Sequence, residues 1–134
     1  DYESARDYLT NLKTDTDYGA ALYLGRTYEA LGDYNYASTI YDNYTINDQS
    51  KAEIYNQLGL CRMHMGEYEL ALSSFQTAMD IEDNGMMQTL KFNEIVAYEY
   101  MEDYKTAAAL MNSYLRAYPD DENAKREYEF LQTR

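Results

Sequence analysis

The stretch "LGDYNYASTIY", residues 31–41, returns in altered form as "MGEYELALSSF" at residues 65–75 and as "MEDYKTAAALM" at residues 101–111. A related phrase, "DYESARDYL", occupies residues 1–9. Every copy carries a tyrosine, an alanine three residues later and a bulky residue seven residues later. These positions lie on one face of an α-helix. The sequence therefore predicts an amphipathic helix that occurs four times along the chain.

The composition is that of an acidic chain of one domain's length. Its 134 residues include 11 lysines and arginines against 24 aspartates and glutamates, a formal charge of −13. This charge repels nucleic-acid phosphates and anionic membranes, so we expect no nucleic-acid partner and a protein or peptide partner that is neutral or basic. The apolar runs are far shorter than the ~20 residues that span a bilayer, so we expect no membrane insertion. The compartment stays open.

Helices of a second kind alternate with the repeated one. Gly32 and Gly66 stand between the two kinds, where a residue in the left-handed conformation can end one helix and turn the chain into the next. Glu102 stands at this place in the third copy, and the same conformation costs about 1 kcal/mol or more for a residue with a Cβ atom. We therefore expect the third turn to differ from the other two.

Eight helices are predicted from these patterns. Their approximate ranges are 2–13, 18–31, 34–46, 51–65, 68–82, 86–101, 104–117 and 121–133. Asp15, Thr16 and Asp17 precede residue 18, and Asp120 and Asp121 follow Pro119 before the last helix, at places where side-chain oxygens can accept hydrogen bonds from free backbone amides. Ser50 and Glu53 have the spacing of a capping box, so we expect them to begin the fourth helix.

The period of about 34 residues, with two helices in each period, resembles that of the tetratricopeptide-repeat family. Residues 18–51 supply the family's signature residues Leu24, Gly25, Tyr28, Gly32, Tyr34, Ala37 and Tyr41. Residues 52–85 supply Tyr55, Leu58, Gly59, Gly66, Tyr68, Ala71, Phe75 and Ala78. The departures from the family's pattern in these two segments are Ala21, Tyr44, Gln49, Arg62 and Asp83.

The third copy of the pattern is the least regular. It keeps Tyr104, Ala107 and Pro119, but the helix before it lacks the leucine–glycine pair, and the segment "DNGMMQTLKFNEI" holds two extra residues. The sequence leaves two core faces open for that helix: either Phe92, Ile95 and Val96, or Leu90, Ala97 and Met101.

The resemblance implies an all-α fold, a right-handed superhelix of antiparallel helix pairs, in a single domain over residues 1–134. It divides the chain into the second helix of a truncated repeat (1–17), two regular repeats (18–51 and 52–85), a divergent repeat (86–120) and a C-terminal capping helix (121–134). Because the sequence begins inside a helix pair, we expect it to be a piece of a longer protein that can self-associate through its first helix.

The sequence shows no pattern for catalysis, a cofactor or a metal ion. His64 is the only histidine, so neither a histidine cluster for zinc nor a second histidine for catalysis is available. Cys61 is the only cysteine and stands where the family has a small residue, so we expect a buried thiol. The acidic clusters "DIEDN" (80–84) and "PDDEN" (119–123) lack the ligand spacing of a calcium loop. We therefore predict that the chain is not an enzyme and holds no cofactor.

In the family that the sequence resembles, the first helix of each pair lines a concave groove that commonly holds a peptide or a partner's helix. Transferred by register onto the two regular repeats, the resemblance implies groove positions at Gly19, Leu22, Arg26, Glu29, Ala30, Glu53, Asn56, Leu60, Met63 and His64. Some members bind acidic C-termini of chaperones through a clamp of lysines, an arginine and asparagines. Leu22, Arg26 and Gln57 break that clamp, so we do not expect chaperone docking.

The sequence thus predicts a non-catalytic protein–protein interaction module that binds a peptide or a partner protein in this groove. Two alternatives stay open. The chain can be an architectural segment of a longer helical-repeat assembly, or the peptide-sensing arm of a regulatory protein.

Overall fold

The computed structural model describes residues 13–134, so the helix predicted near 2–13, with its expected role in self-association, lies outside the described residues. The described part contains seven helices and no strand. They are α2 (Tyr18–Ala30), α3 (Tyr34–Asn47), α4 (Ala52–His64), α5 (Tyr68–Met79), α6 (Met87–Tyr100), α7 (Tyr104–Ala117) and α8 (Glu122–Leu131).

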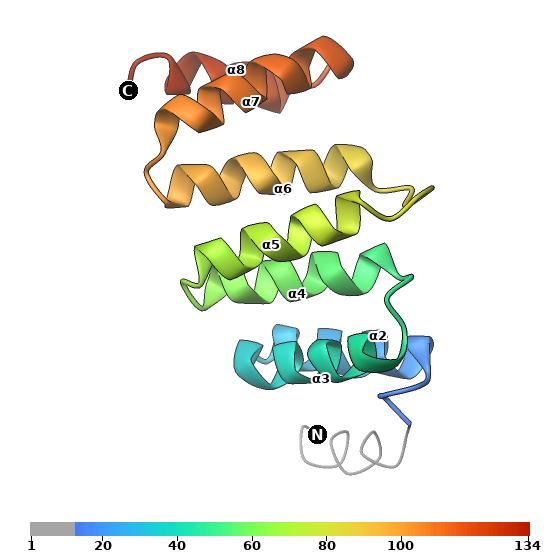
Figure 1. Ribbon diagram of the computed structural model, residues 1–134. Helices are drawn as coiled ribbons and strands as arrows, with labels where there is room; N and C mark the ends of the chain where they lie inside the picture. Colours follow the sequence, from blue (N-terminus) through green and yellow to red (C-terminus); the bar gives the residue numbers. More distant parts are fainter. Residues whose placement is uncertain (1–12) are drawn as a thin grey trace.

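These helices form an elongated stack in chain order, from α2 and α3 at one end to α7 and α8 at the other (Figure 1). Each helix packs chiefly on the helices directly before and after it in the sequence. Packing between sequence neighbours alone is the mark of a helical-repeat solenoid. The predicted all-α solenoid is therefore confirmed.

Three clusters of buried side chains hold the stack together. The first surrounds Tyr28 and Tyr41 between α2, α3 and α4. The second surrounds Phe75 and Leu90 between α4, α5 and α6, and the third surrounds Met111 between α6, α7 and α8. Because each cluster joins three consecutive helices, every helix pair is fastened to the next one through shared apolar contacts.

The closest approach between helices occurs where an aromatic ring of one helix lies on a glycine of its neighbour. A Cβ atom built on Gly25 would lie 2.2 Å from Cε1 of Tyr41, and one built on Gly59 would lie 2.4 Å from Cε1 of Phe75. Real Cβ atoms do not approach other carbons so closely, so only glycine fits at these two places. Both rings are fully buried.

The third helix pair, α6 and α7, solves the same packing problem with other residues. Ile95 follows Gly59 by 36 residues, and Met111 follows Phe75 by the same interval. Both are buried in the third cluster. In this pair, Ile95 of α6 is larger than the glycine of α4, and Met111 of α7 is slimmer and more flexible than the phenylalanine of α5. Because Met111 takes the place of a phenylalanine ring, α6 does not need a glycine at the position of Ile95.

Helix α6 buries side chains from both of the faces that the sequence left open. Leu90 and Ala97 belong to the second cluster, while Ile95 belongs to the third and Phe92 packs against it. The helix lies between α5 and α7 and contacts both. Each alternative therefore described one side of a helix that is packed on two sides.

The third turn does not differ from the first two, so that prediction was wrong. Glu102 takes the left-handed conformation with φ 61°, as Gly32 and Gly66 do with φ 81° and 76°. Its amide donates to the carbonyl of Glu99 and the next amide, of Asp103, donates to Tyr98, repeating the pair of hydrogen bonds found at both glycines. These bonds close the end of α6 and offset the backbone cost of a non-glycine residue.

The helix starts confirm the aspartate caps but not the capping box. Asp17 and Asp121 are the capping residues at these two starts: their carboxylates accept hydrogen bonds from the amides of Ala20 and Ala124, three residues later. Helix α4 instead begins after Lys51, which makes no side-chain cap, and the Ser50 hydroxyl donates to Asp48 at 2.6 Å. Hydrogen bonds from Ser50 and Tyr44 hold the pKa of Asp48 at about 2, so its carboxylate is ionised at neutral pH and engages the Ser50 hydroxyl.

We expect Gly59→Ala to destabilise the protein by about 1 to 3 kcal/mol, because its methyl group would overlap the Phe75 ring. Urea denaturation measures the effect. Gly19→Ala is the matched control: a Cβ atom built there would lie at an ordinary 3.5 Å from Oδ1 of Asp17, so the change should stabilise α2 by about 0.4 to 1 kcal/mol. Equal effects of the two substitutions would contradict the close packing described here.

Glu102→Gly should stabilise the protein by about 1 kcal/mol, because glycine adopts the left-handed conformation without the Cβ penalty. Glu102→Gln keeps the Cβ atom while removing the charge, so it should leave the backbone contribution unchanged. Melting temperatures of the two variants separate the contribution of the backbone conformation from that of the charge. A stabilisation of equal size in both would show that charge rather than backbone strain is responsible.

Candidate partner-binding groove

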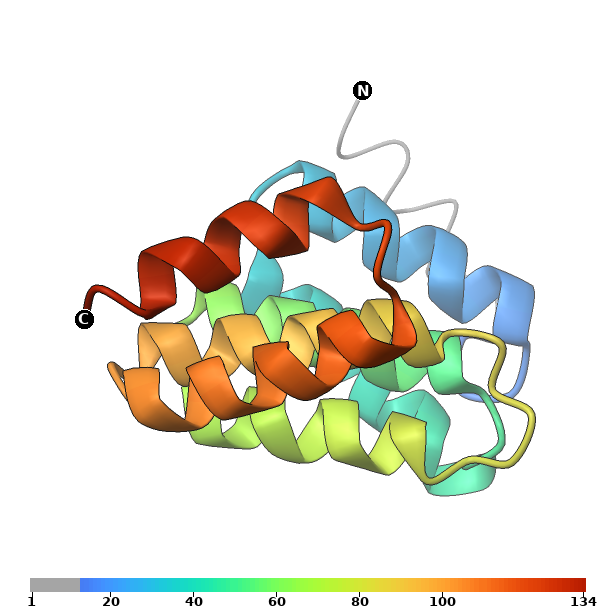
Figure 2. The ribbon, with the colours of Figure 1, turned by 90° about the horizontal axis from the view of Figure 1, so that it is seen from above.

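The even-numbered helices share one side of the stack, which we call the inner face. Figure 2, seen from above, places α2, α4, α6 and α8 toward this side and α3, α5 and α7 toward the other. Helices α2 and α8, at the two ends, lie farther out than α4 and α6 in this view. The backbones of α4 and α6 are therefore set back from those of α2 and α8 on the inner face.

The predicted groove residues on α2 form contacts with α4 or with the core. Arg26 pairs with Glu53 at 2.5 Å across the surface between α2 and α4. The Glu29 carboxylate accepts a hydrogen bond from the Tyr41 hydroxyl and another, of 3.1 Å, from the Gln57 amide. Leu22 packs, partly buried, against the first cluster. The polar groups of Arg26, Glu29 and Glu53 thus fasten neighbouring helices to each other.

Burial and Glu29 together make two side chains near these contacts hard to ionise. The pKa of the Tyr41 phenol is raised chiefly by burial and further by its hydrogen bond to Glu29. Burial, followed by the charge of Glu29, raises the pKa of the Cys61 thiol to about 12. A thiol with this pKa is protonated at neutral pH and unreactive. The prediction of a buried Cys61 is confirmed.

Asn56 connects α4 to α6. Its side chain is buried, and its Oδ1 atom accepts a hydrogen bond of 2.8 Å from the Asn93 amide. A buried amide without such partners would cost free energy, so this bond fixes how the two helices face each other. It also places Asn93 at the pocket between these two helices, which is described next.

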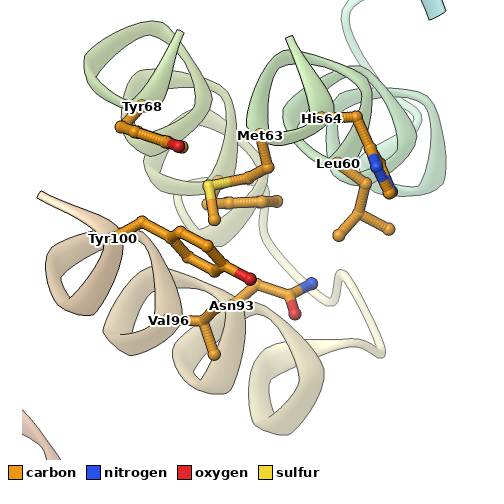
Figure 3. A pocket seen from close by; sticks show the side chains of 8 residues that line it. Leu60, Met63, His64, Tyr68, Asn93, Val96 and Tyr100 are labelled. Atoms are coloured by element: carbon orange, nitrogen blue, oxygen red, sulfur yellow. The ribbon is translucent and has the colours of Figure 1, made fainter. Parts of the chain in front are cut away.

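Three further predicted residues, Leu60, Met63 and His64, line a pocket of about 400 Å³ between α4 and α6, whereas Gly19 and Ala30 are not among its lining residues. We call it the groove pocket; its other lining residues are Tyr68, Phe75, Asn93, Val96 and Tyr100. Figure 3 shows Met63 of α4 and Tyr100 of α6 pointing toward each other across it. The His64 ring stacks on Tyr34 at 4.1 Å, and the Tyr100 ring stacks on Tyr68 at 5.5 Å.

Sequence reasoning missed the α6 side of this pocket. Val96 and Tyr100 follow Leu60 and His64 by 36 residues, the same interval that separates the second and third copies of the repeated phrase. Counting forward from Leu60 and His64 by that interval would have found them. The missing leucine–glycine pair hid this register.

A second pocket, of about 480 Å³, adjoins the groove pocket and shares Val96 and Tyr100 with it. We call it the terminal pocket, because α8 forms its far side. Its remaining lining residues are Phe92, Glu99, Glu102, Tyr104, Glu127 and Phe130. Burial, then hydrogen bonding to Glu127 and the charge of Glu127, raise the pKa of Glu99 to about 8. Two carboxyl groups thus share one partly buried site.

Within residues 13–134, no group of three or more histidine, cysteine, aspartate or glutamate side chains is placed to hold a metal ion. The same part of the chain has no helix whose length and apolar character would let it cross a bilayer.

The comparisons with known proteins bear on the fold of this stack. Residues 92–121 match the family model described as tetratricopeptide repeat, and solved structures with that repeat superpose on most of the chain. Residues 92–121 are therefore similar to a tetratricopeptide repeat, and the stack shares the fold of those solved structures. Members of this family are generally non-catalytic interaction modules. A sequence comparison with curated proteins finds no match.

Three solved structures illustrate the likeness. A crystal structure of MamA has a TM-score of 0.74 and 21% identity over 84% of this chain, which spans 61% of that structure. The second domain of human RPAP3, in complex with an HSP70 peptide, has a TM-score of 0.73 and 16% identity over 84% of this chain and 92% of its own. The Arabidopsis OM64 domain has a TM-score of 0.70 and 20% identity, covering 81% and 88%. At these identities the likeness concerns the fold alone.

The raised pKa of Glu99 predicts that stability falls as the pH rises from about 5 to 8. In this window the unfolded chain, with an ordinary pKa of 4.5, releases a proton that the folded protein keeps. Below it both states hold the proton, and above it both have lost it. Urea denaturation between pH 5 and 8 should show a flatter profile for Glu99→Gln than for the unmodified chain.

Glu69→Gln, at an exposed position of α5, serves as the control and should keep the original slope. A Glu99→Gln profile with the full slope would show that this carboxyl group does not hold its proton in the folded protein.

Proposed function

We propose that this chain is a non-catalytic module that binds an extended peptide, or a segment of a partner protein, on its inner face. The groove pocket carries the proposal. It places apolar atoms of Leu60, Met63 and Val96 beside the polar groups of Asn93 and His64, and Tyr100, a residue with 61% exposure, stands at its edge. Apolar walls with a few polar groups are typical of sites that bind ligands.

The RPAP3 structure, which holds an HSP70 peptide, supports the view that this fold can present a peptide-binding surface. The peptide chemistry should differ here. Leu22 and Arg26 stand at clamp positions, and the Gln57 amide already donates to Glu29. With a formal charge of −13, the chain also repels acidic peptides. We propose a neutral or basic partner.

The chemistry of the candidate nucleophile and base supports a role without catalysis. Cys61 is buried with its pKa raised to about 12, so no thiolate is available at neutral pH. His64 stacks on Tyr34 rather than on an acidic or nucleophilic side chain. A catalytic base needs such a partner within hydrogen-bonding reach, or a substrate proton in its place.

The proposal predicts which side chains a bound peptide needs. Neutral and basic peptides selected from an array should lose at least tenfold in affinity, about 1.4 kcal/mol, with Met63→Ala or Tyr100→Ala. Fluorescence anisotropy of labelled peptides measures this. Ile46→Ala is the matched control, because Ile46 is an apolar residue of α3 with 73% exposure and lies outside both pockets.

The acidic peptide SGPTIEEVD, bound in the RPAP3 structure, should not bind this chain. Selected peptides that bind equally to the Met63 and Tyr100 variants would contradict the proposal. Concentration-dependent assembly in light scattering, without any peptide binding, would favour the architectural role instead.

A further inference from the structure

The terminal pocket brings together carboxylates that have no cationic partner in the described part of the chain. Glu99 comes from α6, Glu102 from the turn after it and Glu127 from α8. The three ion pairs found within residues 13–134 involve none of them. Three acidic side chains from different parts of the fold therefore line the terminal pocket.

Glu99 is the most constrained of the three. Its Oε1 atom is buried and has no hydrogen-bond partner among the described residues. A buried carboxylate oxygen without a donor is costly, and a proton held by Glu99 removes its charge and allows one hydrogen bond to Glu127. Neither of the other carboxylates can supply a donor while ionised, since a carboxylate only accepts hydrogen bonds. Once both Glu99 and Glu127 are ionised, a donor for this pair has to come from another group.

Aromatic rings form the other walls of the pocket. Tyr104 and Phe130 lie on the side of α7 and α8, and Phe92 and Tyr100 on the side of α6. The guanidinium carbon of Arg134 lies 3.7 Å from the centroid of the Phe130 ring and 5.8 Å from that of Tyr104. The chain itself thus shows a cation beside the rings of Phe130 and Tyr104.

We propose that the terminal pocket receives a lysine or arginine side chain of the bound partner, whose cationic head donates to Glu99 and Glu127 while its stem packs on the aromatic walls. Such side chains combine an apolar stem with a charged donor, which is the chemistry that this pocket complements. The inference rests on the proposed function. Because the two pockets share Val96 and Tyr100, one extended peptide can fill both.

Binding of the cation should displace the proton that Glu99 holds near neutral pH and release it to solvent. The affinity for a cationic ligand should therefore rise between pH 6 and pH 9. A neutral ligand of the same shape should show no such rise.

The test uses the whole chain labelled with ¹⁵N and titrated with N-acetylargininamide, N-acetyllysinamide and the neutral citrulline analogue. The two cations should shift the amide signals of Glu99, Glu102 and Glu127, with affinities about tenfold or more above that of the citrulline analogue. Glu99→Gln and Glu127→Gln should each weaken cation binding about tenfold. Glu129→Gln, at an exposed position of the same helix, should leave it unchanged.

Several results would overturn the inference. Equal binding of the citrulline analogue would remove the role of charge. Shifts spread over the acidic surface, and unaffected by Glu127→Gln, would show general electrostatic attraction. Cation binding that appears only after Arg134→Gln would make Arg134 the occupant of the pocket.

The outcome also separates this inference from the proposed function. Peptides whose binding depends on Met63 and Tyr100 but not on Glu99 and Glu127 would support the inner face as the binding surface and refute the cation site. Binding of the two cations in the terminal pocket, with no peptide that depends on Met63, would support the cation site and refute the groove.

Discussion

The structure depends on how closely two helices of a pair approach each other. Where Gly25 lies under Tyr41 and Gly59 under Phe75, the absence of a Cβ atom lets a buried ring lie directly on the neighbouring backbone. The ring then also reaches the cluster that joins the pair to its neighbours. Close packing within a pair therefore fixes which sides of α2 and α4 are left for the inner face.

The same constraint explains how much of the fold the sequence predicts. The phrase with tyrosine, alanine and a bulky residue locates the second helix of each pair, and its spacing locates the helices between them. The turn at Glu102 was predicted wrongly because two hydrogen bonds of the turn outweigh the preference of a non-glycine residue for other conformations. The start of α4 was predicted wrongly because the Ser50 hydroxyl donates to Asp48 instead of capping the helix. In α6, the exchange of glycine for Ile95 removed the sequence signal while the packing remained.

The candidate site was predicted less well than the fold, for a physical reason. Register shows which positions lie on the inner face, but only side-chain contacts decide which of them stay available. Arg26 and Glu53 pair with each other, and Asn56 is bonded to Asn93, whereas Met63 remains at a pocket. The meeting of Glu99 with Glu127 needs the packing of α8 on α7 and could not be read from either segment alone.

The central claim is that a partner contacts α4 and α6 on the inner face. Methyl-resolved NMR of the chain, titrated with a selected peptide, tests it most directly. The claim predicts that the methyl signals of Leu60, Met63 and Val96 shift on binding, while those of Ile46 and Leu70, exposed on α3 and α5, do not. Shifts confined to Ile46 and Leu70 would place the partner on the opposite side of the stack and contradict the claim.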